Sequence, residues 1–203
     1  MKTLVGLIDL SDLGGVIMCR VKLITQSLLL VTILGVFSVY ADQTDSRLDS
    51  LFVTLQNSSD SDELLEAESS IWEIWFDSGE EEIDSLMERA GIAARRGNLA
   101  YAERLYSQVI DKAPDFSEGW NRRATVRYYR EDYEGSLDDI QRTLLLEPRH
   151  FGATWGLGMI LGLQKNFIGA IAAFERLLEL KPNARDAKAR IEVLKEKLAE
   201  SSV

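Results

Sequence analysis

The sequence predicts an all-α fold, in which three consecutive helix pairs stack as an α-α superhelix between an N-terminal helix pair and a C-terminal capping helix. Two observations predict it. The three prolines of the chain, Pro114, Pro148 and Pro182, are 34 residues apart. Because proline cannot continue a helix, a periodic proline marks a periodic helix end. Matching side chains also recur before each proline, and such a period is the signature of a repeat architecture.

Small, aromatic and bulky apolar side chains stand in register before the prolines. A small residue lies twelve positions before each proline, a ring or branched residue eight before, and a bulky apolar residue fifteen before. Small residues let two helices approach closely, and large ones fill the space between adjacent pairs. In this order the residues are Ala102, Ser136 and Ala170; Tyr106, Ile140 and Phe174; and Leu99, Tyr133 and Phe167.

This register resembles the tetratricopeptide repeat (TPR) family, whose unit is a 34-residue antiparallel helix pair. The second copy is the clearest, with Trp120-Asn-Arg-Arg-Ala124 in its first helix, followed by Tyr133 and Ser136. The resemblance implies a TPR solenoid. The leucine–glycine pair of the family appears only in the third copy, as Leu157-Gly158, and arginine–alanine replaces it earlier. These departures concern how the first helices of copies one and two pack.

Atypical elements flank the repeats, since the ends of a repeat array need a covering with a polar outer face. Two apolar stripes separated by a polar turn predict an acidic N-terminal helical cap. Two capping boxes are expected there, Asp60 with Glu63 and Ser78 with Glu81. The predicted segments are a cap at 42–82, repeats at 83–116, 117–150 and 151–184, and an amphipathic capping helix at 185–203.

The first 41 residues predict a secretory signal peptide (1–41). Arg20 and Lys22 precede a short apolar run, and small residues end it at Ala41, where cleavage is expected. The run is shorter than the roughly 20 residues that span a bilayer. An uncleaved anchor is the alternative, because a tilted helix can be short. Met18 is a possible true start, since the acidic residues before it do not suit a signal.

This segment predicts a periplasmic or secreted protein that meets a membrane only if the signal stays uncleaved.

The formal net charge is −10, and residues 42–88 hold fifteen carboxylates and one base. An acidic surface repels phosphates, so we expect no nucleic acid partner.

Chemistry-bearing residues are scarce. Cys19 is the only cysteine and lies in the signal, and His150 is the only histidine. One histidine without cysteine makes none of the usual zinc sites, and a catalytic base needs a partnered nucleophile. The acidic run at residues 80–82 suits the first turn of a helix, where carboxylates complement the dipole. The sequence therefore predicts no enzyme, no cofactor and no metal site, and His150 is interpreted as structural.

The family resemblance implies that the first helices line a concave face that binds a peptide. Tyr, Trp, Met and Arg, which are enriched at interface cores, are frequent on it. A register error of one residue would instead place Tyr128, Trp155 and Met159 in the core, and this alternative stays open. Carried over by position, the predicted peptide-binding groove consists of Met87, Arg95, Asn121, Arg122, Thr125, Tyr128, Tyr129, Trp155, Met159 and Leu163.

Family members that bind chaperone tails clamp a C-terminal carboxylate with lysines and asparagines on the first helices. The corresponding residues here are Met87, Gly91, Arg122, Gly152 and Gly156. Only Arg122 could serve, so this clamp is absent. We expect a non-catalytic scaffold or adaptor of the cell envelope that binds a protein or peptide of unknown identity. The alternative is a structural or self-associating envelope module that acts through its acidic N-terminal helices.

Overall fold

The computed structural model describes residues 45–201, in which all regular secondary structure is helical. The predicted signal peptide (1–41) lies outside the described residues. No helix within residues 45–201 combines the length and apolar character that a bilayer crossing needs. The helices are α2 (Arg47–Asn57), α3 (Ser61–Phe76), α4 (Glu81–Arg95), α5 (Leu99–Lys112), α6 (Ser117–Tyr129), α7 (Tyr133–Leu146), α8 (Phe151–Leu163), α9 (Phe167–Leu180) and α10 (Arg185–Glu200).

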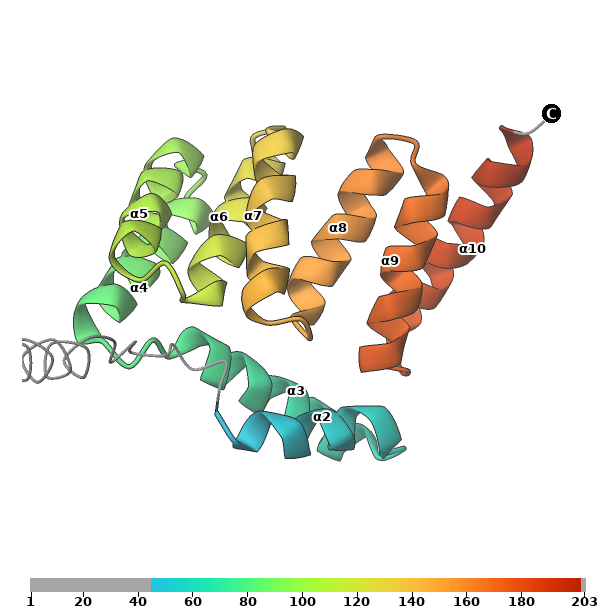
Figure 1. Ribbon diagram of the computed structural model, residues 1–203, viewed down its shortest axis with the longest axis horizontal. Helices are drawn as coiled ribbons and strands as arrows, with labels where there is room; N and C mark the ends of the chain where they lie inside the picture. Colours follow the sequence, from blue (N-terminus) through green and yellow to red (C-terminus); the bar gives the residue numbers. More distant parts are fainter. Residues whose placement is uncertain (1–44, 202–203) are drawn as a thin grey trace, which may run out of the picture. The chain divides into compact units, whose positions relative to one another are not determined.

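Three antiparallel pairs, α4–α5, α6–α7 and α8–α9, follow one another along the described part of the chain (Figure 1). The second helix of each pair packs against the first helix of the next, and α10 packs against α9 in the same way. The three second helices end at Lys112, Leu146 and Leu180, each two residues before a proline. The predicted all-α repeat fold is confirmed.

The 34-residue period extends to the backbone of the turn inside each pair. A positive φ occurs at Gly97 (78°), Glu131 (63°) and Lys165 (60°). The residue after each of them is the N-cap of the second helix, and its side chain accepts a hydrogen bond from a backbone N–H three residues on. Such caps satisfy a donor that the first turn leaves free. The N-caps are Asn98, Asp132 and Asn166.

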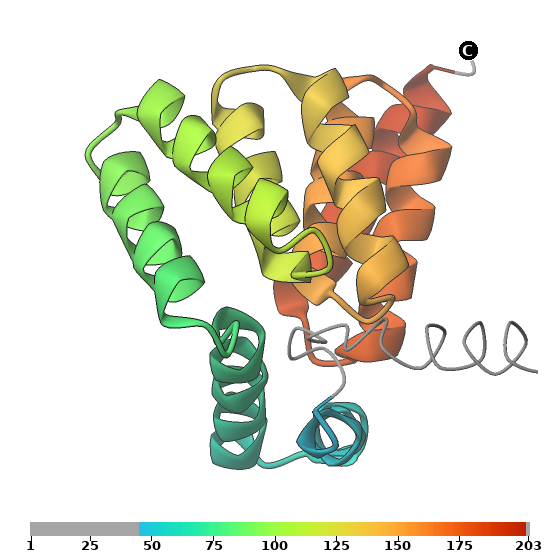
Figure 2. The same cartoon turned by 60° about the vertical axis from the view of Figure 1, so that its left-hand side comes forward.

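The N-terminal pair, α2 and α3, lies across the ends of later helices (Figures 1 and 2). A cap at the start of the array would pack mainly on α4 and α5. Instead α2 contacts α9 and α3 contacts α6. Trp75 of α3 packs in one hydrophobic cluster with Phe52 of α2, Phe151 of α8 and Ile191 of α10. Because this aromatic face finds its partners in the third repeat, the pair joins the middle of the array to its C-terminal end.

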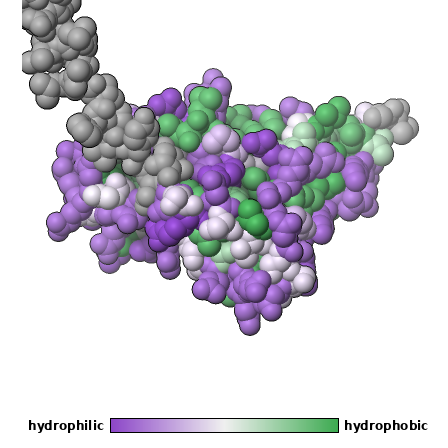
Figure 3. Space-filling view, turned by 60° about the horizontal axis from the view of Figure 1, so that its bottom comes forward, coloured by the Kyte–Doolittle hydropathy of each residue, from purple (hydrophilic) through white to green (hydrophobic). Residues whose placement is uncertain are grey.

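The face on which α2 and α3 lie is mostly hydrophilic. In Figure 3, which brings these helices forward, hydrophobic residues form patches separated by hydrophilic ones. The apolar sides of both helices are turned inward, since Leu48, Phe52, Ile71 and Trp75 are all buried. The carboxylates of this acidic segment therefore remain largely at the surface.

The two predicted capping boxes fare differently. Asp60 is the N-cap of α3 and accepts hydrogen bonds from the backbone N–H groups of residues 62 and 63. The Glu63 carboxylate, however, accepts from the Ser58 hydroxyl at 2.7 Å. The second box is wrong: α4 begins after Glu80 without a side-chain cap, and the Ser78 hydroxyl donates to Asp84 at 2.6 Å. The Ser78 hydroxyl therefore contacts Asp84, six residues later, and not Glu81.

Candidate functional site

A pocket of about 320 Å³ opens between the first helices of the second and third pairs, α6 and α8. Its walls come from these two helices, and Ser136 and Ile140 of α7 also line it. We call it the α6–α8 groove. Its other lining residues are Asn121, Ala124, Thr125, Tyr128, Tyr129, Gly152, Ala153, Trp155, Gly156, Met159 and Ile160.

Six of the ten predicted groove residues line this pocket. Tyr129 is exposed over 68% of its surface, and Thr125 is also exposed. Tyr128, Trp155 and Met159 are half-buried and also pack against the core clusters, so they belong to both groove and core. Leu163 is 52% exposed at the end of α8, beyond the pocket lining. The six are Asn121, Thr125, Tyr128, Tyr129, Trp155 and Met159.

The other predicted residues lie elsewhere. Met87 is a correction: it is 7% exposed and packs with Tyr106 and Phe116 in the core of the first repeat. Its apolar side chain fills the junction of α4 with the neighbouring helices and does not face the groove. Arg95 is exposed at the end of α4 and does not line the groove. Arg122 belongs to a polar cluster beside the groove.

That cluster is centred on Glu118 in the first turn of α6, which is 0% exposed. One carboxylate oxygen accepts from Arg122 Nε at 2.5 Å. The other accepts from Asn121 Nδ2 at 2.8 Å and lies 2.9 Å from His150 Nε2. Burial alone would raise the pKa of Glu118, but the charge of Arg122 and the hydrogen bond from His150 hold this pKa below its usual value. We call these four residues the Glu118 cluster.

His150 has both ring nitrogens engaged. Nδ1 accepts from the backbone N–H of Ala153 at 3.1 Å, which makes His150 the side-chain N-cap of α8. Nε2 therefore carries the proton that is donated to Glu118. The ring stacks on Trp75 with centroids 4.2 Å apart and an interplanar angle of 10°. With 0% exposure and no free nitrogen, His150 is a structural residue, as the sequence suggested.

Helix α3 borders the groove at Gly152. A Cβ atom placed on Gly152 would stand 2.8 Å from the Trp72 ring, so the indole lies directly on the backbone of α8. The Arg122 guanidinium lies 4.3 Å from the Phe76 ring centroid and 5.6 Å from that of Trp72. Arg122 is thus held by a carboxylate and by aromatic rings of α3, and this arrangement satisfies it within the chain.

A second hollow, of about 510 Å³, continues from the groove toward the start of α10. Gly152 and Trp155 line both spaces. Its remaining walls come from Glu68 and Trp72 of α3, from Phe151 and Leu177, from the turn between α9 and α10 and from the first turn of α10. Lys181 and Glu68 form an ion pair at 2.5 Å on this wall. The groove therefore opens, past Trp155, into a more polar space that α3 helps to enclose.

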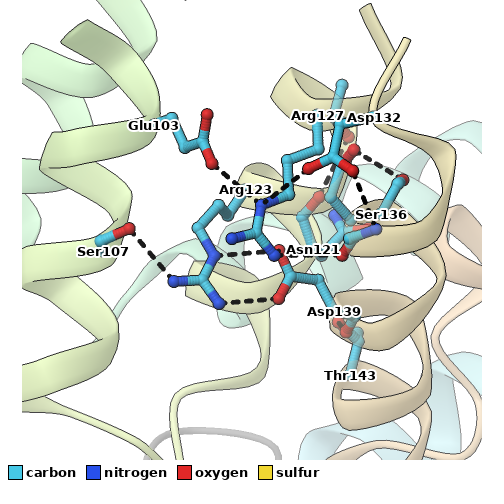
Figure 4. A network of polar contacts seen from close by, with 12 residues as sticks. Glu103, Ser107, Asn121, Arg123, Arg127, Asp132, Ser136, Asp139 and Thr143 are labelled. Atoms are coloured by element: carbon cyan, nitrogen blue, oxygen red, sulfur yellow. Dashed lines mark hydrogen bonds and ion pairs between the residues drawn. The ribbon is translucent and has the colours of Figure 1, made fainter. Parts of the chain in front are cut away.

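On its other side, α6 is held by a network of ion pairs (Figure 4). Arg123 makes two contacts with the buried Asp139 carboxylate, at 2.9 and 2.7 Å, and donates to Ser107 at 3.1 Å. Arg127 contacts Asp139 at 3.1 Å and Glu103 at 3.0 Å. Arg123 occupies the leucine position of the family's leucine–glycine pair. An arginine is tolerated there because the Asp139 carboxylate of α7 and the Ser107 hydroxyl of α5 accept its hydrogen bonds.

Sequence reasoning missed Glu118 and the part played by α3. One signal was available, since Glu118 and Arg122 are four residues apart on one helix and can pair. Nothing local shows that His150 completes the cluster or that Trp75 stacks on His150. Within residues 45–201, no group of three or more acidic, histidine or cysteine side chains is arranged to hold a metal ion.

Comparison with known proteins agrees with this architecture. The tetratricopeptide repeat model matches residues 121–185. A TPR repeat-containing protein of Rhizobium etli is 37% identical over 153 residues, which cover 75% of this chain and 75% of the relative.

Solved structures agree as well. The TPR domain of Sgt2 from Aspergillus fumigatus aligns with a TM-score of 0.57 at 24% identity, over 61% of this chain and 83% of that domain. The first TPR of Spaghetti (RPAP3), solved bound to the HSP90 peptide SRMEEVD, aligns with a TM-score of 0.56 at 20% identity, over 58% of this chain and 93% of its own. The fold, the 34-residue period and the Rhizobium relative together lead to one conclusion: the chain belongs to the tetratricopeptide repeat family.

Proposed function

We propose that this protein is a non-catalytic interaction scaffold that binds a peptide or protein segment in the α6–α8 groove. The observation that carries the proposal is the groove itself, where Tyr128, Tyr129, Trp155 and Met159 gather on adjacent first helices. Aromatic and methionine side chains are enriched at interface cores. The solved complex of the RPAP3 repeat with an HSP90 peptide supports the proposal by analogy of fold.

Selection from a random-peptide phage library on the purified full chain tests the proposal, followed by calorimetry with the selected peptides. Tyr129→Glu places a carboxylate on the open wall of the groove and should weaken binding at least about tenfold, which is roughly 1.4 kcal/mol. Ile168→Glu is the matched control. Ile168 is 70% exposed on α9 and does not line the groove, so this variant should bind like the parent.

Two outcomes would contradict this proposal. Either no peptide is enriched over an unrelated helical protein, or the two variants lose affinity equally. In the second case the bound surface would lie outside the α6–α8 groove.

We propose a location in the cell envelope, with export by a signal cleaved after Ala41. The support is the order of charged, apolar and small residues in the first 41 positions. Fractionation of cells followed by N-terminal sequencing of the mature protein tests it. A mature chain that begins at Asp42 fits the proposal. A full-length chain in the membrane fraction would instead support the uncleaved anchor.

The alternative function, self-association through the acidic N-terminal helices, has less support. Leu48, Phe52, Ile71 and Trp75 of these helices are buried against the rest of the chain. What they present outward is largely acidic, and like charges on two copies repel each other. Among the large apolar residues of α3, Leu65 is the most exposed, at 68%. Sedimentation analysis of the full chain would reveal a dimer if this alternative holds.

A further inference from the structure

We infer that the α6–α8 groove selects an uncharged segment that packs a bulky apolar side chain against Trp155 and Met159 and donates a backbone N–H to Asn121. This inference rests on the proposed function and specifies the chemistry of the partner. Three features of the groove carry it: its lack of charge, its continuity with the packing of α3, and the orientation of the Asn121 amide.

The lining of the groove contains no charged side chain. Helix α8, which forms one wall, has the sequence FGATWGLGMILGL and carries no charge along its 13 residues. Arg122, which follows the lining residue Asn121, is already paired with Glu118 and lies over Phe76. A charged group of a partner would lose its hydration in this groove without gaining a counter-ion, which is unfavourable. An uncharged segment does not incur this loss.

The packing of α3 shows which side chains the α8 backbone accepts. The Trp72 ring rests on Gly152, where the absent Cβ leaves room for it. One turn further along α8, Gly156 also lines the groove, and there Ile140 of α7 takes the place of Trp72, with its side chain 3.2 Å from the Cβ position of Gly156. Trp155 and Met159 flank this position on the same helix. A bulky apolar or aromatic side chain of a partner would therefore extend, beside Trp72, an interface that already exists within the chain.

Asn121 supplies the polar contact. It is 6% exposed and lines the groove, and its Nδ2 donates to Glu118 at 2.8 Å. This bond fixes the orientation of the amide, because Glu118 is itself held by His150 and Arg122. The Asn121 Oδ1 atom accepts no hydrogen bond within residues 45–201. Because the amide is already fixed in orientation, this oxygen can accept a hydrogen bond from a backbone N–H of the bound segment.

Peptides obtained from the phage library test the apolar requirement. Alanine scanning identifies the apolar residue of a selected peptide that contributes most to binding. This residue is then replaced by glutamate or lysine. Each replacement should weaken binding about tenfold or more, as measured by calorimetry. On the protein, Thr125→Glu adds a carboxylate inside the groove and should weaken binding of the apolar peptide to the same extent. Ala172→Glu, at an exposed position of α9 outside the groove, is its control.

The hydrogen bond to Asn121 is tested by a thermodynamic double-mutant cycle, in which the peptide and the protein are changed separately and together. Methylation of the peptide's backbone nitrogens, one at a time, should identify one position where the loss is about tenfold with the parent protein. The same methylation should cost little with Asn121→Ala, since the acceptor is then missing. This difference separates a direct contact from a general effect of methylation on the peptide.

The possible results are distinguishable. The inference is overturned, and the scaffold function stands, if the selected peptides carry a charged anchor residue. The same conclusion follows if Thr125→Glu binds apolar peptides with the affinity of the parent protein while Tyr129→Glu binds them more weakly. If methylation costs the same in both proteins, the role of Asn121 is refuted. If no peptide is selected at all, the scaffold function fails, and this inference fails with it.

Discussion

Replacement of Glu118 by alanine tests whether the Glu118 cluster holds this protein together. The variant removes the acceptor of three contacts, from Arg122 at 2.5 Å, Asn121 at 2.8 Å and His150 at 2.9 Å. Arg122 is partly exposed and can turn toward water. His150 is fully buried, and its Nε2–H would be left without an acceptor. The variant also leaves a space at the edge of the His150 ring.

The expected cost follows from these contacts. Breaking a buried ionic pair by removing one partner destabilises a protein by about 3–5 kcal/mol. In a chain of about this size, 1 kcal/mol lowers the melting temperature by roughly 2–4 °C. We therefore expect Glu118→Ala to melt about 10 °C below the parent, measured by circular dichroism and checked by urea unfolding.

Glu175→Ala is the matched control for this measurement. Glu175 is an exposed carboxylate on α9 with no ion pair in the described part of the chain. Exposed substitutions of this kind usually change stability by less than about 0.5 kcal/mol. If Glu118→Ala loses less than about 1 kcal/mol, the cluster is not a structural centre and the reasoning on α3 fails with it.

Three further predictions concern neighbouring residues. The pKa of Glu118 is lowered from its usual value of 4.5, so its contribution to stability is present above that pH and is lost as the pH falls through the folded-state pKa. The difference in melting temperature between the parent and Glu118→Gln should therefore shrink below about pH 4.5 in a series of thermal melts. Arg122→Ala should lower the free energy of unfolding by about 3 kcal/mol, because it leaves the buried carboxylate without its cation, whereas Tyr129→Ala should keep the parent's stability in the same urea titration. Gly97→Ala should lower the free energy of unfolding by about 1 kcal/mol, because Gly97 has a φ of 78° that alanine adopts only with strain. No atom lies within 4 Å of the added Cβ, so a steric clash would not contribute. An unchanged midpoint of urea unfolding would therefore refute the conformational argument.

The repeat fold could be predicted because its signals are local. A proline two residues after each second helix and a small residue at each close approach are read directly from the sequence. The N-caps Asn98, Asp132 and Asn166 carry the same 34-residue period and would have placed the start of each second helix as well. Each of these features depends on residues only a few positions away.

The placement of α3 could not be predicted in this way. Trp75 and His150 meet although 75 positions separate them, and nothing in the local pattern around either residue indicates the other. An aromatic stripe predicts that a helix face is buried, but it does not say against what. For the same reason Glu118 looked like one of the 33 acidic residues of the chain until the fold surrounded it with donors.

The groove residues were predictable to the extent that the repeat register determines them. Asn121, Thr125, Tyr129, Trp155 and Met159 line the groove because the first helices of consecutive repeats present equivalent positions on the same side. Met87 obeys the same register but packs in the core of the first repeat, outside the groove. Register gives the direction in which a side chain leaves its helix, and the packing of the neighbouring helices decides whether that direction is open.

The two junctions between repeats show how the groove keeps its shape. Glu103, Ser107 and Arg123 form ion pairs and hydrogen bonds at the first junction, where the second junction has Leu137, Gln141 and Leu157, each 34 residues later. Helix α6 is thus held on one side by the Arg123–Asp139 network and on the other by the Glu118 cluster. Both depend on direction, because hydrogen bonds weaken steeply when their angles change.

Nonspecific apolar contact would allow α6 to slide or rotate more easily than these bonds do. Since α6 and α8 together form the groove, the fixed orientation of α6 keeps the Asn121 amide and the Tyr129 ring in place before any partner arrives. A preorganised site loses less conformational entropy on binding than a mobile one. We therefore expect the polar residues of α6, which depart from the apolar pattern of the family, to favour the proposed binding by holding the wall of the groove rigid.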